Sequence, residues 1–371
     1  MILRSIIQSL AMTLITVSLS IAHPLSPNRS MAGSPRVSAS PIFIFHADRF
    51  WLNLHHFLYV LGRAQNQAPD STRDAVEMAP ADQEQGLAGL NKQDQTIWRD
   101  AVSAYAASLS HKDLIFDKSL SSITSALAKA GDARSLDGVA IDSTVASTLT
   151  RVAPTYRKQW WAKHRAANQE WQKRTTAIVN QYGADVLAFI TKAYQLPWPA
   201  AGYDVNISAY ANWAGAYSVD GGLVVLSSLA PGNRGTYELE STFHEAMHQW
   251  DAEVFEALRT AARKQNKLVP RNLSHTMIFF TAGEAVRHVV PRHVPYAIQF
   301  RLWEGAFGDF KPALDEVWKP YLDGSGARDD ALAELIRRTA TQTRPAGPTM
   351  MRVNRKQEFA RAYLLRMRPI S

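Results

Sequence analysis

The chain has 371 residues, enough for one large or two modest globular domains. It contains no cysteine, which excludes disulfide bonds and a lipidated cysteine anchor. The formal net charge is +8, but the basic excess lies from Arg337 onward, so it does not indicate a nucleic-acid-binding body and we expect no nucleic-acid partner.

The N-terminus has the pattern of a secretory signal peptide over residues 1–22. Arg4 supplies the charge, Ile6 to Ile21 the apolar stretch, and small residues precede a cleavage point at His23. An uncleaved membrane anchor is the weaker alternative, because the apolar stretch is short and contains polar residues. Export without cysteines indicates a bacterial periplasmic or secreted protein. Residues 23–41, rich in Ser and Pro, are expected to form a flexible leader.

Residues 42–150 are predicted to form an N-terminal helical region. Ile42 to Arg63 has the pattern of one buried helix, and Gln67 to Gln95 that of a polar loop or solvated helix. Asp94 to Ser108 and Phe116 to Ala130 are predicted to be amphipathic helices.

Three histidines of this region form a group in the sequence: His46, His55 and His56. Adjacent helical residues cannot face one metal ion together, so we expect His55 and His56 to have core or supporting roles.

Residues 151–345 are predicted to form one larger domain, beginning with a helix from Pro154 to Tyr182 and a second helix from Asp185 to Tyr194. One stripe of the first helix carries Trp160, His164, Asn168 and Trp171. A polar pair inside an aromatic stripe indicates a buried hydrogen-bonded network, with a cleft wall as the alternative.

Strand patterns follow at Asp204–Ser208, Gly215–Val219 and Leu223–Ser228, with a turn at Asp220–Gly222. The chain as a whole is therefore predicted to be α+β and predominantly helical, with a small antiparallel or mixed sheet.

The central motif is His244-Glu245-Ala246-Met247-His248. Residues four apart share one helix face, so both imidazoles can bind one zinc ion, with Glu245 beside the open coordination position. Zinc acidifies water, and Glu245 can accept the proton while that water attacks a carbonyl. The alternative is a buried helix with two satisfied histidines.

The extended window resembles that of the zincin metallopeptidases, through Thr242, Phe243, Ala246, Met247, Gln249 and Trp250. Residues 150–300 also resemble exported bacterial proteins of unassigned function. The zincin resemblance implies a sheet before the motif helix, a peptide or protein substrate, and Ala214 to Ser218 as a substrate-binding edge. An ordinary hairpin is the equal alternative.

The third zinc ligand is predicted to be Glu284. The metzincin continuation is absent, because Asp251 and Phe255 stand at its positions. Gluzincins use a Glu on a following helix, and Glu284 is the only acid in the apolar helix predicted from Asn272 to Val290. The alternative is an ion pair with Arg287 or His288. The thermolysin pattern is not met, because His288 replaces its Asp.

A donor to the developing oxyanion is also expected, and Tyr296 is the first choice. His293, His288 and His275 are the other candidates. His275 lies about two and a half turns before Glu284, on the opposite side of the helix.

The C-terminal part is predicted to contain helices at Phe310–Leu322 and Asp329–Thr341. The tail, residues 346–371, is basic; it is either solvated or in weak contact with an anionic envelope surface.

Together these patterns predict an exported zinc metallopeptidase of gluzincin type, with His244, His248 and Glu284 as metal ligands and Glu245 and Tyr296 as catalytic residues. The alternatives are a non-catalytic zinc protein that binds peptides or envelope ligands, and a helical structural protein with a chance motif. The substrate, endo- or exopeptidase action and the oligomeric state stay open.

Overall fold

The computed structural model describes residues 41–66, 74–212, 214–219, 222–305 and 307–340. All of them belong to one compact unit, residues 40–371. The predicted signal peptide, the predicted leader up to residue 40 and the predicted basic tail lie outside the described residues. Within the described ranges, no helix combines the length and hydropathy that a membrane crossing requires.

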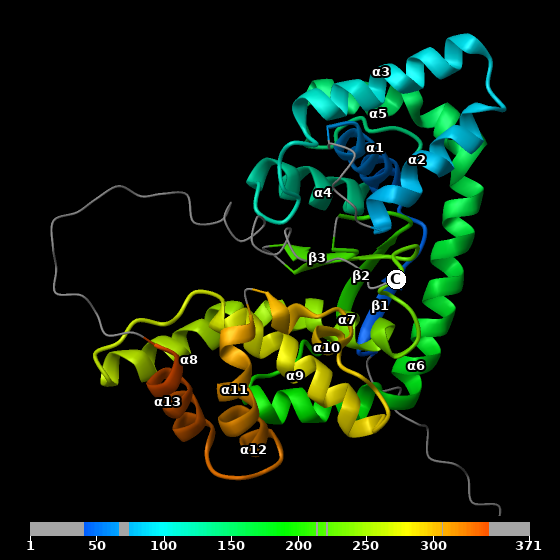
Figure 1. Cartoon of the computed structure of the whole chain (residues 1–371). Coiled ribbons are helices and arrows are strands. Elements are labelled where there is room, and N and C mark those ends of the chain that lie inside the picture. Colours follow the sequence, from blue (N-terminus) through cyan, green and yellow to red (C-terminus); the bar gives the residue numbers. More distant parts are fainter. Residues whose placement is uncertain (1–40, 67–73, 213, 220–221, 306, 341–371) are drawn as a thin grey trace, which may run out of the picture. The chain divides into compact units, whose positions relative to one another are not determined.

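A four-stranded mixed sheet lies at the centre of this unit, in the order β1-β2-β4-β3 (Figure 1). Strands β1 (Phe43–His46), β2 (Tyr203–Ser208) and β4 (Leu223–Ser227) are parallel, and β3 (Ala216–Val219) pairs antiparallel with β4 at the edge. Most of the remaining residues are helical, so the predicted α+β, predominantly helical fold class is confirmed. The three strands predicted before the motif are present, and the sheet is of the mixed kind.

Helices cover both faces of the sheet (Figure 1). One face meets α1 (Phe50–Asn66), α2 (Asp74–Leu87), α3 (Lys92–Ser108), α4 (Lys118–Ala130) and α5 (Ser143–Tyr156). The other face meets α7 (Thr236–Met247), α8 (Asp251–Lys264), α9 (Leu273–Val289) and α13 (Arg328–Thr339). Helix α6 (Ala162–Tyr194) runs beside both groups, and the short helices are α10 (Tyr296–Gln299), α11 (Lys311–Ala313) and α12 (Lys319–Leu322).

The strands alternate between two hydrophobic cores, as the period of two requires. Val205 and Ile207 point into the core with α7 and α9, whereas Tyr217 and Val225 belong to the core with α1 to α5. The sheet is therefore the layer that separates the two cores.

The prediction of a single helix from Ile42 to Arg63 was wrong. The segment begins with β1, which pairs in parallel with Tyr203 to Asn206 of β2, and the helix starts only at Phe50. A short apolar run does not distinguish strand from buried helix by its periodicity. The partner strand lies far along the chain, so local sequence does not reveal the pairing.

The predicted boundaries around Pro154 and Asp185 were also wrong. Helix α5 starts at Ser143, capped by the Asp142 carboxylate, and runs through Pro154 to a π-helical turn at Arg157–Trp161. From there α6 continues without a break to Tyr194. Gly183 does not end the helix; it allows close packing, because an added Cβ would lie 3.2 Å from the Ile42 side chain.

The other helix predictions are confirmed to within a few residues. They correspond to α3, α4, α9, the helical turns between Gly308 and Leu322, and α13. Residues 67–95 were predicted to be a polar loop or a solvated helix. They contain helix α2, so the helix alternative is the one that the structure has.

The aromatic stripe of α6 contains the predicted buried network. His164 Nε2 lies 2.7 Å from the Asp82 carboxylate and its Nδ1 2.8 Å from the Tyr156 hydroxyl. Asn168 donates to the Asn53 side chain at 3.0 Å and accepts from the Ser228 hydroxyl at 2.6 Å. These bonds join the sheet to the helices around it.

The core role expected for the adjacent histidines is confirmed as well. His56 lies between the hydroxyls of Ser208, at 3.0 Å, and Tyr217, at 2.7 Å. His55 Nδ1 lies 3.1 Å from the Tyr105 hydroxyl. Both imidazoles are fully buried.

Candidate metal centre

Helix α7 presents the first two candidate ligands. It begins at Thr236, after Gly235, and the chain tightens into a 3-10 turn at His248–Trp250. The Nε2 atoms of His244 and His248 lie 3.2 Å apart. Two nitrogens at about 2.05 Å from one tetrahedral zinc ion would be about 3.3 Å apart. The helix therefore already sets the spacing that a shared metal ion requires.

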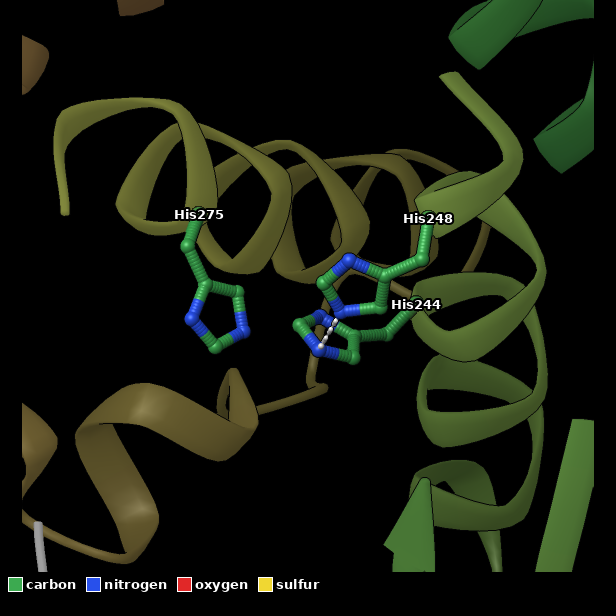
Figure 2. A group of neighbouring side chains, drawn as sticks. All are labelled: His244, His248 and His275. Atoms are coloured by element: carbon green, nitrogen blue, oxygen red, sulfur yellow. Dashed lines mark hydrogen bonds between the residues drawn. The ribbon is translucent and has the colours of Figure 1, made fainter. Parts of the chain in front are cut away.

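The third imidazole is His275, near the start of α9. The potential ligand atoms of His244, His248 and His275 all lie within 4.8 Å of one another. Figure 2 shows the three rings converging on one space from two helices. Three histidines are thus close enough to bind a metal ion, and catalytic zinc sites commonly have three protein ligands.

The surroundings of the cluster suit imidazole ligands. Asp251 contacts His248 Nδ1 at 3.1 Å, which leaves Nε2 directed at the other rings. Burial lowers the pKa of His244 and His275, so both favour the neutral form that binds metal. Phe279 covers the His244 ring, with centroids 3.9 Å apart. His244 Nδ1 is buried without a hydrogen-bond partner among the described residues.

Glu245 lies beside the cluster, as the motif predicts. The Ser218 hydroxyl of β3 donates to its carboxylate at 3.0 Å. Burial raises the pKa of Glu245 to about 6, although the charge of His248 acts in the opposite direction. A carboxyl group with this pKa can accept and return a proton near neutral pH.

Glu284, the predicted third ligand, is not part of the cluster. Its carboxylate accepts a hydrogen bond from Arg287 at 2.6 Å and lies 3.6 Å from the Lys319 ammonium. Glu284 therefore forms an ion pair with Arg287, which was the predicted alternative to metal binding. Since His275 and Glu284 lie on opposite sides of α9, only one of them can face the metal centre, and the packing of α9 against α7 places His275 there.

Tyr296, the first choice as oxyanion donor, lies beside the motif. It lines a small pocket together with His244 and Glu245. Its backbone N–H donates to the buried carboxylate of Glu240, at 2.8 Å. The same carboxylate lies 2.6 Å from His293 Nε2.

The other oxyanion candidates lie elsewhere. His293 is occupied on both nitrogens, by Glu240 and by the Thr236 hydroxyl. The ring of His288 packs at a tilt against Phe189, with the ring centroids 5.2 Å apart. His275 belongs to the histidine cluster instead.

A cleft of about 870 Å³ opens over the three histidines. The edge strand β3 forms one side, and Phe255 of α8, which is 47 % exposed, lies on another. Ile115, Phe116 and Lys118, before and at the start of α4, complete the wall. The cleft therefore joins the candidate metal centre to a strand edge that no other described strand pairs with.

Sequence reasoning missed Asp251 and Ser218, and it placed His275 away from the metal. The sequence did contain a signal for the contact between Asp251 and His248, because a carboxylate three residues after a histidine on a helix lies on the same face. The sequence contained no such signal for Ser218, since its contact with Glu245 depends on how β3 packs against α7.

No protein-family model matches the sequence, and neither a curated protein nor a solved structure is significantly similar to it.

Proposed function

We propose that this chain is a zinc-dependent peptidase of the zincin kind whose third metal ligand is His275. One observation carries the proposal: three histidines within 4.8 Å of one another adjoin Glu245 in a cleft bordered by a sheet edge. Imidazole suits several transition metals, and a three-histidine set with a neighbouring carboxylate favours catalytic zinc.

The chain's own residues supply the remaining chemistry. A bound zinc ion would supply Lewis acidity for polarising a carbonyl. Glu245 accepts the proton of the attacking water and returns it to the leaving amine, while the Ser218 hydrogen bond orients its carboxylate. Asp251 holds His248 in the orientation that directs Nε2 inward.

The strand edge gives the proposal its substrate class. In the part of the chain that the structure describes, strand β3 pairs with β4 alone, and Ala214 and residues 216–219 line the cleft. An extended peptide can add to such an edge through backbone hydrogen bonds. Because the sequence also predicts a signal peptide, we propose that the enzyme is exported and cleaves peptides or proteins.

The test combines metal analysis with Glu245→Gln. The wild-type protein is expected to hold about one zinc per chain and to cleave peptides from a broad library. Glu245→Gln should retain the zinc and lose at least about 100-fold in turnover, because only the proton transfer is removed. Zinc without turnover in the wild type would favour the non-catalytic binding protein, and a protein that takes up no metal would overturn both.

A further inference from the structure

Helix α7 carries two buried carboxylates in addition to Glu245, and they face different partners. Glu238 accepts a hydrogen bond from the partly exposed guanidinium of Arg174 on α6, at 2.9 Å. Glu240 pairs instead with His293, and the two side chains are only 2 % and 1 % exposed. Burying a carboxylate with its partner costs free energy that an apolar pair would not cost. A gain in stability therefore does not by itself explain Glu240.

The partners of Glu240 belong to residues 290–296, the segment that connects α9 to α10. His293 Nε2 lies 2.6 Å from the carboxylate, and the Tyr296 backbone N–H donates to both carboxylate oxygens, at 3.0 and 2.8 Å. His293 Nδ1 lies 2.8 Å from the hydroxyl of Thr236, the first residue of α7. Thr236 and Glu240 are four residues apart, so they lie on one face of the helix. The connecting segment is thus attached to α7 at three points.

Helix α9 leaves room for this attachment at Gly283. A Cβ added there would lie 2.6 Å from the Pro295 side chain and 3.1 Å from the Glu240 carboxylate. Glycine destabilises a helix interior relative to alanine. The close approach of the α7 carboxylate and the connecting segment against α9 gives this glycine a physical reason.

The attachment fixes the backbone of Tyr296 beside the candidate metal centre. Glu240 lies one turn before His244 on the same face of α7, and Tyr296 lines the same part of the cleft as His244 and Glu245. The Tyr296 ring packs on Phe300, with the ring centroids 4.2 Å apart. One helix therefore carries two candidate metal ligands, Glu245 and the attachment of Tyr296.

From these contacts we infer that Glu240 and His293 are positioning residues for Tyr296 in the proposed peptidase. They hold the tyrosine where its hydroxyl can donate to the oxyanion that develops on the attacked carbonyl. Both act through Tyr296 and not on the reacting atoms. The inference rests on the proposed function and adds two residues to its site.

The test is a double-mutant cycle on peptide cleavage by the zinc-loaded protein. Tyr296→Phe removes the hydroxyl, and Glu240→Ala removes the attachment. Each should lower kcat by at least about tenfold and change KM by less than about threefold, because an interaction of the transition state is lost. In the Tyr296→Phe protein, Glu240→Ala should lower kcat by less than about threefold further, because the two residues act as one unit.

Glu238→Ala is the matched control, because it also removes a buried, paired carboxylate from α7. Any loss of kcat that it causes through stability should be the same with and without Tyr296→Phe. Glu240→Gln keeps an oxygen that accepts from the Tyr296 amide, so it should recover most of the kcat lost in Glu240→Ala. If Glu240→Ala does not fold, Gly283→Ala displaces the connecting segment from α9 and should show the same coupling to Tyr296→Phe.

Hydrogen exchange provides a second readout that does not depend on turnover. The Tyr296 amide is bound to a buried carboxylate, so Glu240→Ala should make its exchange at least about tenfold faster. Glu238→Ala should not produce this local change. Both variants should keep about one zinc per chain, because their candidate ligands are intact.

The outcomes separate this inference from the peptidase proposal. Losses of kcat that multiply in the Glu240→Ala/Tyr296→Phe protein would show that Glu240 does not act through Tyr296, and the peptidase would stand. Unchanged exchange of the Tyr296 amide in Glu240→Ala would likewise exclude the attachment alone. A zinc-loaded wild type that cleaves no peptide of a broad library would overturn the peptidase proposal, and this inference with it.

Discussion

Two groups of buried or half-buried histidines lie on opposite sides of the sheet, and they differ in what their ring nitrogens face. The packing histidines, His55, His56 and His164, contact hydroxyls or a carboxylate in the core with α1 to α5. The cleft histidines, His244, His248 and His275, converge on one another beside an open cleft.

The difference shows which property of a buried histidine indicates function. Burial lowers the pKa of both His55 and His244, so neither burial nor the pKa direction separates the groups. The separating feature is convergence: the packing histidines face hydroxyls or a carboxylate, whereas the potential ligand atoms of the three cleft histidines lie within 4.8 Å of one another, as ligands of one metal ion would. The predictions below test this separation.

The largest effect is expected from replacing a cleft histidine. His275→Ala removes one of three candidate ligands and should weaken zinc binding by more than about 100-fold. Glu284→Ala, on the opposite side of the same helix, should keep about one zinc per chain. Metal content after dialysis against a weak chelator measures both. Loss of zinc in Glu284→Ala with retention in His275→Ala would restore Glu284 as the ligand.

Replacing a packing histidine should lower the stability of the fold and leave zinc binding unchanged. His164→Ala leaves a buried cavity and removes a partner of Asp82, so the free energy of unfolding should fall by about 3 kcal/mol. Zinc content should stay at about one per chain. Urea denaturation alongside metal analysis checks this. A variant of unchanged stability that loses zinc would show that the separation between the two groups is wrong.

The packing histidines should also make stability depend on pH. Burial lowers the pKa of His55 from 6.5 to about 3, and burial lowers that of His56 too. The unfolded chain therefore binds protons first, so stability is full above pH 6.5 and declines below it. Each histidine contributes up to about 1.4 kcal/mol per pH unit.

The measurement is urea denaturation of the metal-free protein between pH 7 and pH 5. His56→Gln removes one titrating group and should make the decline shallower than in the wild type. Equal slopes for the two proteins would exclude His56 as a source of the pH dependence.

The smallest effect is expected at the residue that orients a cleft histidine. Asp251→Asn weakens the contact to His248 Nδ1 and should lower zinc affinity by about 10- to 100-fold without changing the fold. Glu253→Gln, an exposed acid two residues further on, is the matched control and should leave the affinity unchanged. Competition with a chromophoric zinc chelator measures both variants, and identical affinities would remove Asp251 from the site.

Local patterns predicted those parts of the structure that depend on one element at a time. Helical spacing placed His244 and His248 on one face, and it placed His164 and Asn168 in one buried stripe. Strand alternation predicted β2, β3 and β4 before the motif helix. In each case the signal is the fixed period of the element itself.

The sequence by itself determined the fold class, the spacing of the first two candidate ligands and the position of Glu245 beside them, because these follow from residues within a few turns of each other. Only the tertiary structure decided that β1 completes the sheet and that His275 rather than Glu284 faces the cluster. Helix periodicity places His275 and Glu284 on opposite sides of α9. Which side meets α7 is decided by packing between segments distant in the chain, and no local period contains that information.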